Sequence, residues 1–219
     1  MSVAMIWGSP GSGKTVAATA PKNEKIKLLC SDNSAVVLNM FDRKNVDVER
    51  VEHWLDQGDG NYFTAQFERA AASGKYTLIV IDNLTDLKEL ALMEIEDAGK
   101  LKDIRQIYQA VYMAIKRLTR TAANSKCHVT FTCWDDAEEI TKNDGTLALR
   151  QFPNLPRKIL PQVLGLCNIV GQMAKPKGKD GNMRWFLITE DSETRYGCKD
   201  QLYGRKSILP EQLYEVAKK

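Results

Sequence analysis

The sequence has no apolar stretch long enough to cross a membrane. Its apolar runs are short, as at residues 78–81, whereas a spanning helix needs roughly 18 apolar residues in a row. The first residues also lack the basic flank and the long apolar core of a secretory signal. We therefore expect a cytoplasmic protein that has no membrane partner.

Cysteine and histidine are scarce, and they do not cluster. The five cysteines form no C-x-x-C pair, and there are only two histidines. Zinc sites need such ligands at close, regular spacing. The pattern argues against a structural zinc site and is typical of a protein whose thiols stay reduced.

Internal repeats, low-complexity tracts and linkers rich in serine or proline are also missing. The chain has 219 residues, 43% of them hydrophobic, which is enough for one sizeable core. We expect a single domain over residues 1–219, with its core at about 1–150 and a C-terminal β extension at about 151–219.

The net charge is only +3, but the charges are distributed unevenly. Residues 145–179 contain no Asp or Glu, and all six of their charged side chains are basic: Arg150, Arg157, Lys158, Lys175, Lys177 and Lys179. Such a segment is a candidate surface for a phosphate-rich partner.

Hydrophobic patterns predict strands that alternate with helices. We expect strands at 3–7, 26–30, 76–81 and 128–134, and helices at 14–20, 62–73 and 101–125. A hairpin should follow, with its turn at 143–145, and strands at 166–173 and 184–189 should form an antiparallel addition. The alternation indicates an α/β fold with a mainly parallel central sheet flanked by helices.

The strongest motif lies between the first strand and the first helix. The pattern G-x-x-x-x-G-K-[ST] is matched in full by Gly8, Ser9, Pro10, Gly11, Ser12, Gly13, Lys14 and Thr15. Backbone N–H groups of such a loop and the start of the next helix converge on the α- and β-phosphates of a nucleotide. Lys14 should reach the β- and γ-phosphates, and the Thr15 hydroxyl should bind Mg²⁺.

Besides the Thr15 hydroxyl, the metal ion needs an acidic residue. The strand at 76–81 places Asp82 at its carboxyl end. Asp82 could also cap the helix that begins near Leu84. Asn83 occupies the next position, where many motor proteins carry a water-polarising glutamate, and an amide cannot act as a base. The general base must therefore come from elsewhere.

With these residues the chain resembles the RecA-like P-loop ATPases, and among them the phage-encoded nucleotide-binding proteins of recombination and single-strand annealing. The likeness covers most of the chain and rests on four segments, residues 8–15, 79–84, 130–134 and 195–199. The resemblance implies a RecA-like P-loop fold, ATP and Mg²⁺ as ligands, ATPase activity and, for a phage protein, the host cytoplasm.

The resemblance also implies roles for individual residues. Asp32 follows the strand after the P-loop helix, where this branch places its general base, although usually as a glutamate. Thr132 is the nearest candidate for the polar sensor on the fourth strand, with Trp134 or Asp135 beyond it. Lys199 is the first candidate for a cation supplied to a neighbouring subunit's γ-phosphate, and Arg195 and Arg205 are further candidates.

The resemblance further implies that the chain forms a homo-oligomer, a ring or a filament, that binds single-stranded DNA. A single-strand-binding protein is a further candidate partner. The six cations of residues 145–179 could neutralise DNA phosphates. Phe152, which lies between Arg150 and Arg157, could stack an unpaired base, with Trp134 and Trp185 as weaker candidates. Annealing or strand exchange is the expected activity.

Three other functions stay open at this point. A small-molecule kinase would carry the same loop but would need a mobile arginine-rich lid. A helicase loader of DNA replication has closer chemistry, and Asn83 after Asp82 argues against it. A nucleotide-gated binding module with negligible hydrolysis is favoured if Asp32 is not catalytic.

Overall fold

The computed structural model describes residues 1–99, 103–175 and 185–215. Its centre is a nine-stranded sheet in the order β11-β9-β8-β1-β5-β4-β2-β3, with β10 paired to β8. The six consecutive strands that run parallel are β8 (Ile169–Ala174), β1 (Val3–Trp7), β5 (His128–Cys133), β4 (Leu78–Asp82), β2 (Ile26–Cys30) and β3 (Val46–Arg50). The expected mainly parallel α/β sheet is confirmed.

Short antiparallel strands complete one edge of this sheet. They are β9 (Phe186–Ile188), β10 (Lys199–Asp200) and β11 (Ser207–Ile208). Strands β1, β2 and β4 are buried along their whole length because elements cover both faces of the sheet, which explains their continuous apolar runs.

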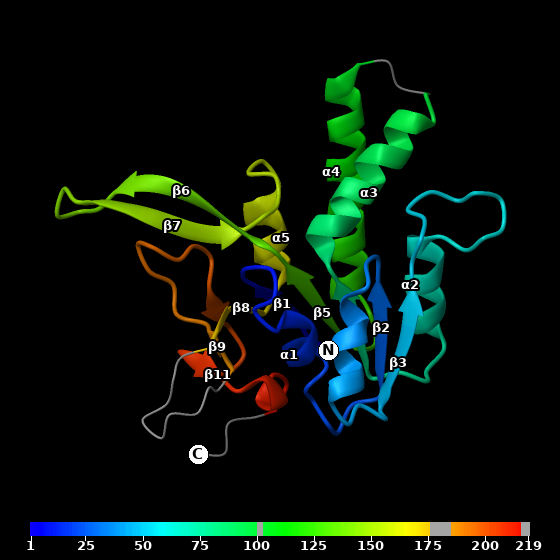
Figure 1. Ribbon diagram of the computed structural model, residues 1–219, viewed down its shortest axis with the longest axis horizontal. Coiled ribbons are helices and arrows are strands. Elements are labelled where there is room, and N and C mark those ends of the chain that lie inside the picture. The colour runs from blue at the N-terminus through cyan, green and yellow to red at the C-terminus, as the bar shows by residue number, and fades with distance from the viewer. Residues whose placement is uncertain (100–102, 176–184, 216–219) are drawn as a thin grey trace.

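Four helices cover one face of the sheet and shorter elements cover the other. The first face packs against α2 (Phe63–Ala72), α3 (Leu84–Asp97), α4 (Ile104–Ala123) and α5 (Leu160–Leu166). The second face packs against α1 (Lys14–Ala18), the 3₁₀ helix η1 (Ser34–Met40) and the segment that ends in the 3₁₀ helix η2 (Pro210–Gln212). Figure 1 shows α3 and α4 as a pair that rises above the sheet.

The predicted hairpin forms a separate two-stranded ribbon, β6 (Asp135–Thr141) and β7 (Leu147–Pro153). Its turn contains Gly145 at φ +82°, a conformation that L side chains rarely adopt. In Figure 1 the ribbon extends away from the central sheet on the side opposite to β2 and β3.

Several expectations for the elements were wrong. The strand expected at 166–173 starts later, at Ile169, because Leu166 ends α5. This strand, β8, pairs antiparallel with β9 as expected, and its other edge pairs in parallel with β1. Strand β3 was not predicted because its apolar residues alternate with charged ones. It lies at the edge of the sheet, where its side chains are only partly buried. Within the described residues, no helix is long and apolar enough to cross a membrane.

Candidate active site

Strand β1 ends at Trp7 and leads into a glycine-rich loop that turns back into α1. Gly11 and Gly13 have φ values of +74° and +93°, which favour glycine. A Cβ on Gly13 would also lie 3.0 Å from Nε1 of Trp185. Gly13 therefore meets both a conformational and a steric requirement of the loop.

The Lys14 side chain folds back over this loop. Its Nζ donates hydrogen bonds to the carbonyl oxygens of Gly8 at 2.8 Å and Ser9 at 2.9 Å, and the residue is 7% exposed. Burial lowers the pKa of Lys14, and the negative charges of Asp82 and Asp135 oppose this shift. A lysine ammonium has three protons, so one N–H remains for a ligand in the cavity.

Asp82 gathers hydroxyl groups from three other elements. Its Oδ2 accepts hydrogen bonds from Thr15 Oγ1 at 2.6 Å and from Ser34 Oγ at 2.8 Å, while Thr132 Oγ1 donates to Oδ1. Asp82 itself is 2% exposed. A carboxylate beside hydroxyl oxygens is a donor set that suits Mg²⁺, which prefers oxygen ligands and binds few carboxylates.

Asp32 lies in the same cavity. Its Oδ1 accepts a hydrogen bond from the Ser34 backbone N–H at 2.8 Å, and its Oδ2 accepts one from Asn83 Nδ2 at 3.4 Å. Asn83, rather than Asp82, caps α3, because its Oδ1 accepts the Asp86 N–H at 2.7 Å. The capping role considered for Asp82 is therefore wrong. Its carboxylate instead accepts the hydrogen bonds from Thr15, Ser34 and Thr132.

The cavity has a volume of about 330 Å³, and it joins the loop, the end of β4 and the residues after β2. Its lining consists of Pro10, Gly11, Gly13, Lys14, Thr15, Val16, Asp32, Ser34, Val37, Asp82, Asn83 and Trp134. The structure thus brings together Lys14, Thr15, Asp32 and Asp82, which are far apart in the sequence.

Two contacts at the site were not predicted, although Asp135 was a candidate for the polar sensor. The Ser34 hydroxyl bonds to Asp82, although Ser34 follows a different strand. Asp135, at the start of the projecting ribbon, accepts a hydrogen bond from Ser9 Oγ at 2.9 Å. Both contacts depend on how strands pair in space, which local patterns do not encode.

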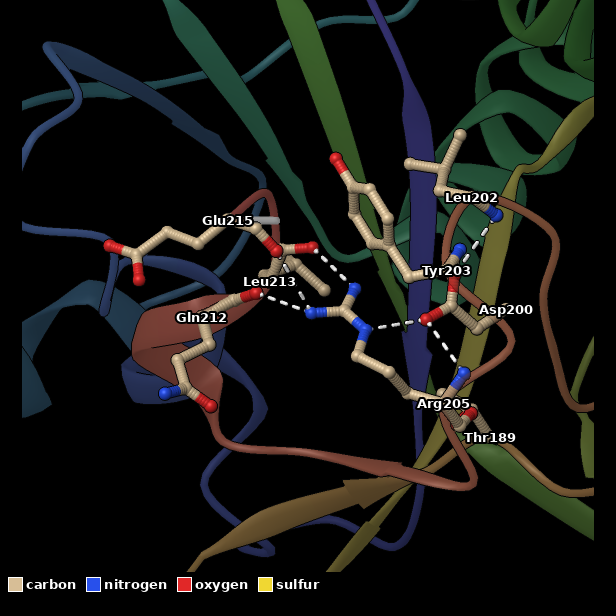
Figure 2. Close-up of polar contacts among 8 residues, drawn as sticks. All are labelled: Thr189, Asp200, Leu202, Tyr203, Arg205, Gln212, Leu213 and Glu215. Atoms are coloured by element: carbon tan, nitrogen blue, oxygen red, sulfur yellow. Dashed lines mark hydrogen bonds and ion pairs between the residues drawn. The ribbon is translucent and has the colours of Figure 1, made fainter. Parts of the chain in front are cut away.

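Two arginines, Arg195 and Arg205, were further candidates for a cation supplied to a neighbouring subunit. Both form hydrogen bonds within their own chain. Arg195 Nε donates to Gln172 Oε1 at 2.7 Å. Arg205 Nε donates to Asp200 Oδ2 at 2.6 Å, and its other nitrogens donate to backbone carbonyls (Figure 2). Lys199 lies half-buried on β10, opposite Val170 of β8.

The residues expected to contact DNA differ in accessibility. Phe152 is 4% exposed, and the Arg157 guanidinium lies 3.4 Å from the centre of its ring. The ring is therefore covered, and the expectation that Phe152 stacks an unpaired base is wrong. Arg157 also pairs with Glu138 at 2.5 Å, and Arg150 Nε donates to the carbonyl of Glu193 at 2.8 Å.

The remaining cations of that segment are Lys158, Lys175, Lys177 and Lys179. Lys158 is exposed, and the exposed Lys175 places its Nζ 4.9 Å from the centre of the Trp185 ring. Lys177 and Lys179 lie outside the described residues. Among the two tryptophan candidates, Trp134 lines the active-site cavity and Trp185 packs against Gly13.

Comparison with known families gives one match. A family model described as an AAA domain matches residues 2–199, which is most of the chain. No protein of curated function matches the sequence.

Solved structures match this chain at low sequence identity. An ATPase of the type III secretion system of pathogenic bacteria is 16% identical, with a TM-score of 0.51 over 79% of this chain and 51% of that one. The flagellar accessory protein FlaH of Methanocaldococcus jannaschii is 11% identical, with a TM-score of 0.48 over 94% of this chain and 83% of that one. The P4 protein of bacteriophage phi6, solved with ADP, is 12% identical, with a TM-score of 0.41 over 85% of this chain and 54% of that one. The alignments with the secretion ATPase and P4 span about half of each of those chains.

Proposed function

We propose that this chain, which belongs to the AAA domain family and is a P-loop ATPase that uses ATP and Mg²⁺, has its ATPase site in the cavity between residues 8–15 and Asp82. The observation that carries this proposal is the buried contact of 2.6 Å between Thr15 Oγ1 and Asp82 Oδ2. These two residues lie 67 positions apart, and the contact places a hydroxyl and a carboxylate directly beside Lys14.

The charged and hydroxyl side chains at the cavity then have roles in the proposed reaction. The free N–H of Lys14 binds phosphate oxygens, together with the backbone N–H groups of residues 8–15. Thr15 and Asp82 would hold Mg²⁺, and the ion would supply positive charge to the outer phosphates. Asp82 keeps its orientation through the hydroxyls of Ser34 and Thr132.

Asp32 is the proposed general base. Its carboxylate accepts a proton from the water that attacks the γ-phosphorus, and ADP is the leaving group. The hydrogen bonds from the Ser34 N–H and the Asn83 amide fix its orientation in the cavity.

Replacing Asp32 with Asn tests this role. The variant Asp32→Asn keeps an oxygen that can accept the Ser34 N–H but loses the base, so we expect turnover to fall about 10²- to 10⁴-fold. ATP affinity, measured by calorimetry with Mg²⁺, should stay near the wild-type value. The matched variant Asp42→Asn changes an exposed carboxylate and should leave both values unchanged. Wild-type turnover in Asp32→Asn would remove Asp32 from the mechanism.

We further propose that the chain forms a homo-oligomer, a ring or a filament, that binds single-stranded DNA. This assembly promotes annealing or strand exchange in phage recombination or replication. The excess of positive charge over residues 145–179 supports this proposal, and among the described cations Lys158 and Lys175 are the exposed lysines. Lys199 remains the candidate cation for a neighbouring subunit.

The salt dependence of DNA binding tests this partner. The double variant Lys158→Ala/Lys175→Ala should weaken binding of a labelled single strand and reduce the slope of log K against log salt by about 0.7 for each phosphate that is no longer neutralised. Fluorescence anisotropy measures both quantities. The control Lys44→Ala/Lys126→Ala removes two exposed lysines outside residues 145–179. Equal effects of the two double variants would rule out the proposed DNA surface.

A further inference from the structure

The ribbon formed by β6 and β7 has two different faces. On one face Phe152 is buried, and Arg150 Nε donates a hydrogen bond to a backbone carbonyl of the segment after β9. On the other face Leu147 and Leu149 are 68% and 63% exposed. Glu139 lies directly opposite Leu149 in the strand pairing, so it shares this exposed face. Large apolar side chains exposed side by side on a projecting element are typical of a docking surface.

The ribbon is long enough to reach a neighbouring molecule. Each of its strands has seven residues, which at about 3.4 Å per residue gives a length of roughly 24 Å. Figure 1 shows the ribbon extending away from the central sheet. Strand β6 carries four acidic side chains and no basic one. A partner that fits the exposed face of the ribbon therefore needs an apolar recess beside positive charge.

Such a recess is the hollow between α2 and α4, which has a volume of about 560 Å³. Its apolar walls include Trp54, Phe67 and Leu118. Arg117 and Arg120 of α4 also line it, and both are exposed. The hollow therefore offers space for apolar side chains and cations for a carboxylate.

The charges around this hollow favour an acidic partner. Helix α4 carries four basic side chains and no acidic one. Asp56 and Glu68 also line the hollow, and the Asp56 carboxylate accepts two backbone N–H groups of its own loop. In the part of the chain that the structure describes, neither Arg117 nor Arg120 forms an ion pair. Both arginines are therefore available to a carboxylate from another molecule.

The ribbon and the hollow lie on opposite sides of the chain. Figure 1 shows α2 on the side of β2 and β3, and the ribbon on the other side of the sheet. One chain therefore cannot place its ribbon in its own hollow, but a second copy can. A contact between two different patches repeats from copy to copy, and it generates a ring if the rotation closes and a filament if it does not.

We infer that the exposed face of the ribbon docks into the hollow between α2 and α4 of a second copy of this chain. Leu147 and Leu149 pack against the apolar walls, and Glu139 pairs with the two arginines. The inference rests on the proposed homo-oligomer, and it names the two surfaces through which the copies meet.

Sedimentation velocity of the full chain with ATP and Mg²⁺ tests the ribbon half of this contact. The variant Leu147→Ser/Leu149→Ser should weaken self-association at least about tenfold, because two large apolar side chains are no longer removed from water. Leu209→Ser changes another exposed leucine and is the matched control. Because these leucines are exposed, both variants should keep the circular dichroism spectrum of the wild type.

Charge reversal tests the hollow. Arg117→Glu/Arg120→Glu should weaken self-association at least about tenfold, and so should Glu139→Arg, because each change places like charges opposite one another. Combining all three changes in one chain restores opposite charges and should recover part of the lost association. Arg105→Glu reverses an exposed cation of α4 outside the hollow and should behave as wild type.

Wild-type association of the leucine variant or of the arginine variant would overturn the inference and leave the homo-oligomer to other surfaces. A combined variant that associates no better than its parents would also overturn it. If the leucine variant associated normally but bound labelled single-stranded DNA more weakly, the ribbon would contact DNA and not a second copy. A wild-type chain that stayed monomeric would refute the proposed homo-oligomer together with this contact.

Discussion

At the scale of single residues, the site depends on one buried carboxylate that receives several hydrogen bonds. Asp82 accepts bonds from Thr15, Ser34 and Thr132, which come from α1, η1 and β5. Burying a charge is costly unless it is satisfied in this way. The three hydroxyls therefore stabilise the fold and also fix the carboxylate for its proposed ligand.

Thr132→Val removes one of these donors without changing the side-chain volume. Thr132 is 0% exposed, so the change leaves part of a buried carboxylate unsatisfied, and we expect a destabilisation of about 1–3 kcal/mol in urea unfolding. Thr132→Ser keeps the hydroxyl and should recover much of this stability. Equal stabilities of the Val and Ser variants would contradict the role of the hydroxyl.

Lys14→Ala tests the phosphate site at the same scale. The ammonium should contact the ligand, so we expect phosphate release to fall about 10²- to 10³-fold, while the circular dichroism spectrum stays that of a folded chain. Lys126→Ala removes an exposed lysine elsewhere and should behave as wild type. Normal turnover in Lys14→Ala would overturn the assignment of the site.

Much of the site could be predicted because its key residues lie in local patterns. The glycine-lysine motif and an acid after an apolar strand place Lys14, Thr15 and Asp82 at one edge of the sheet. Ser34 could not be found in this way, because its contact with Asp82 depends on the pairing of β2 with β4. The burial of Phe152 depends equally on distant residues.

At the scale of elements, buried strands were predictable and edge strands were not. Strands β1, β2, β4 and β5 have apolar runs bounded by turn residues or by charged ones. On α4 the expected apolar face is only partly buried, since Ile104 is 58% and Tyr108 42% exposed. Helical periodicity shows which residues share a face, but it does not show how far the neighbouring elements extend.

The Arg205 network makes a prediction about the C-terminal segment. Arg205→Met removes the donors of three backbone carbonyls and leaves the buried Asp200 unpaired, so we expect the unfolding free energy to fall by about 3–5 kcal/mol. Limited proteolysis should then cleave residues 200–215 first. Lys206→Met changes the neighbouring cation, whose side chain is 79% exposed, and should have no measurable effect. Equal protease resistance in both variants would show that Arg205 does not hold residues 212–215 in place.

At the scale of the whole molecule, His128 connects segments near both ends of the described chain. The Ser2 backbone N–H donates to His128 Nδ1 at 3.2 Å, and the ring of Tyr214 lies 4.2 Å from the histidine ring. The Tyr214 hydroxyl in turn lies 2.6 Å from Thr130 Oγ1. The start of β5 therefore holds residues that are more than 200 positions apart in the sequence.

Burial lowers the pKa of His128 below its ordinary value of about 6.5. As the pH falls below that value, the unfolded chain binds this proton first, so stability declines on the acid side. His128→Gln removes the titration, and its melting temperature should fall less than that of the wild type between pH 7.5 and pH 5.5. Parallel melting curves for the two proteins across this range would contradict the prediction.

The position of β1 has a consequence for synthesis on the ribosome. Strand β1 is made before both of its neighbours in the sheet, β5 and β8, whose residues begin at positions 128 and 169. At typical translation rates, roughly 10 to 30 s pass before β8 exists. Until then β1 has at most one of its two neighbours in the sheet, β5. A prematurely terminated chain that lacked β8 would carry an open sheet edge at the phosphate-binding loop.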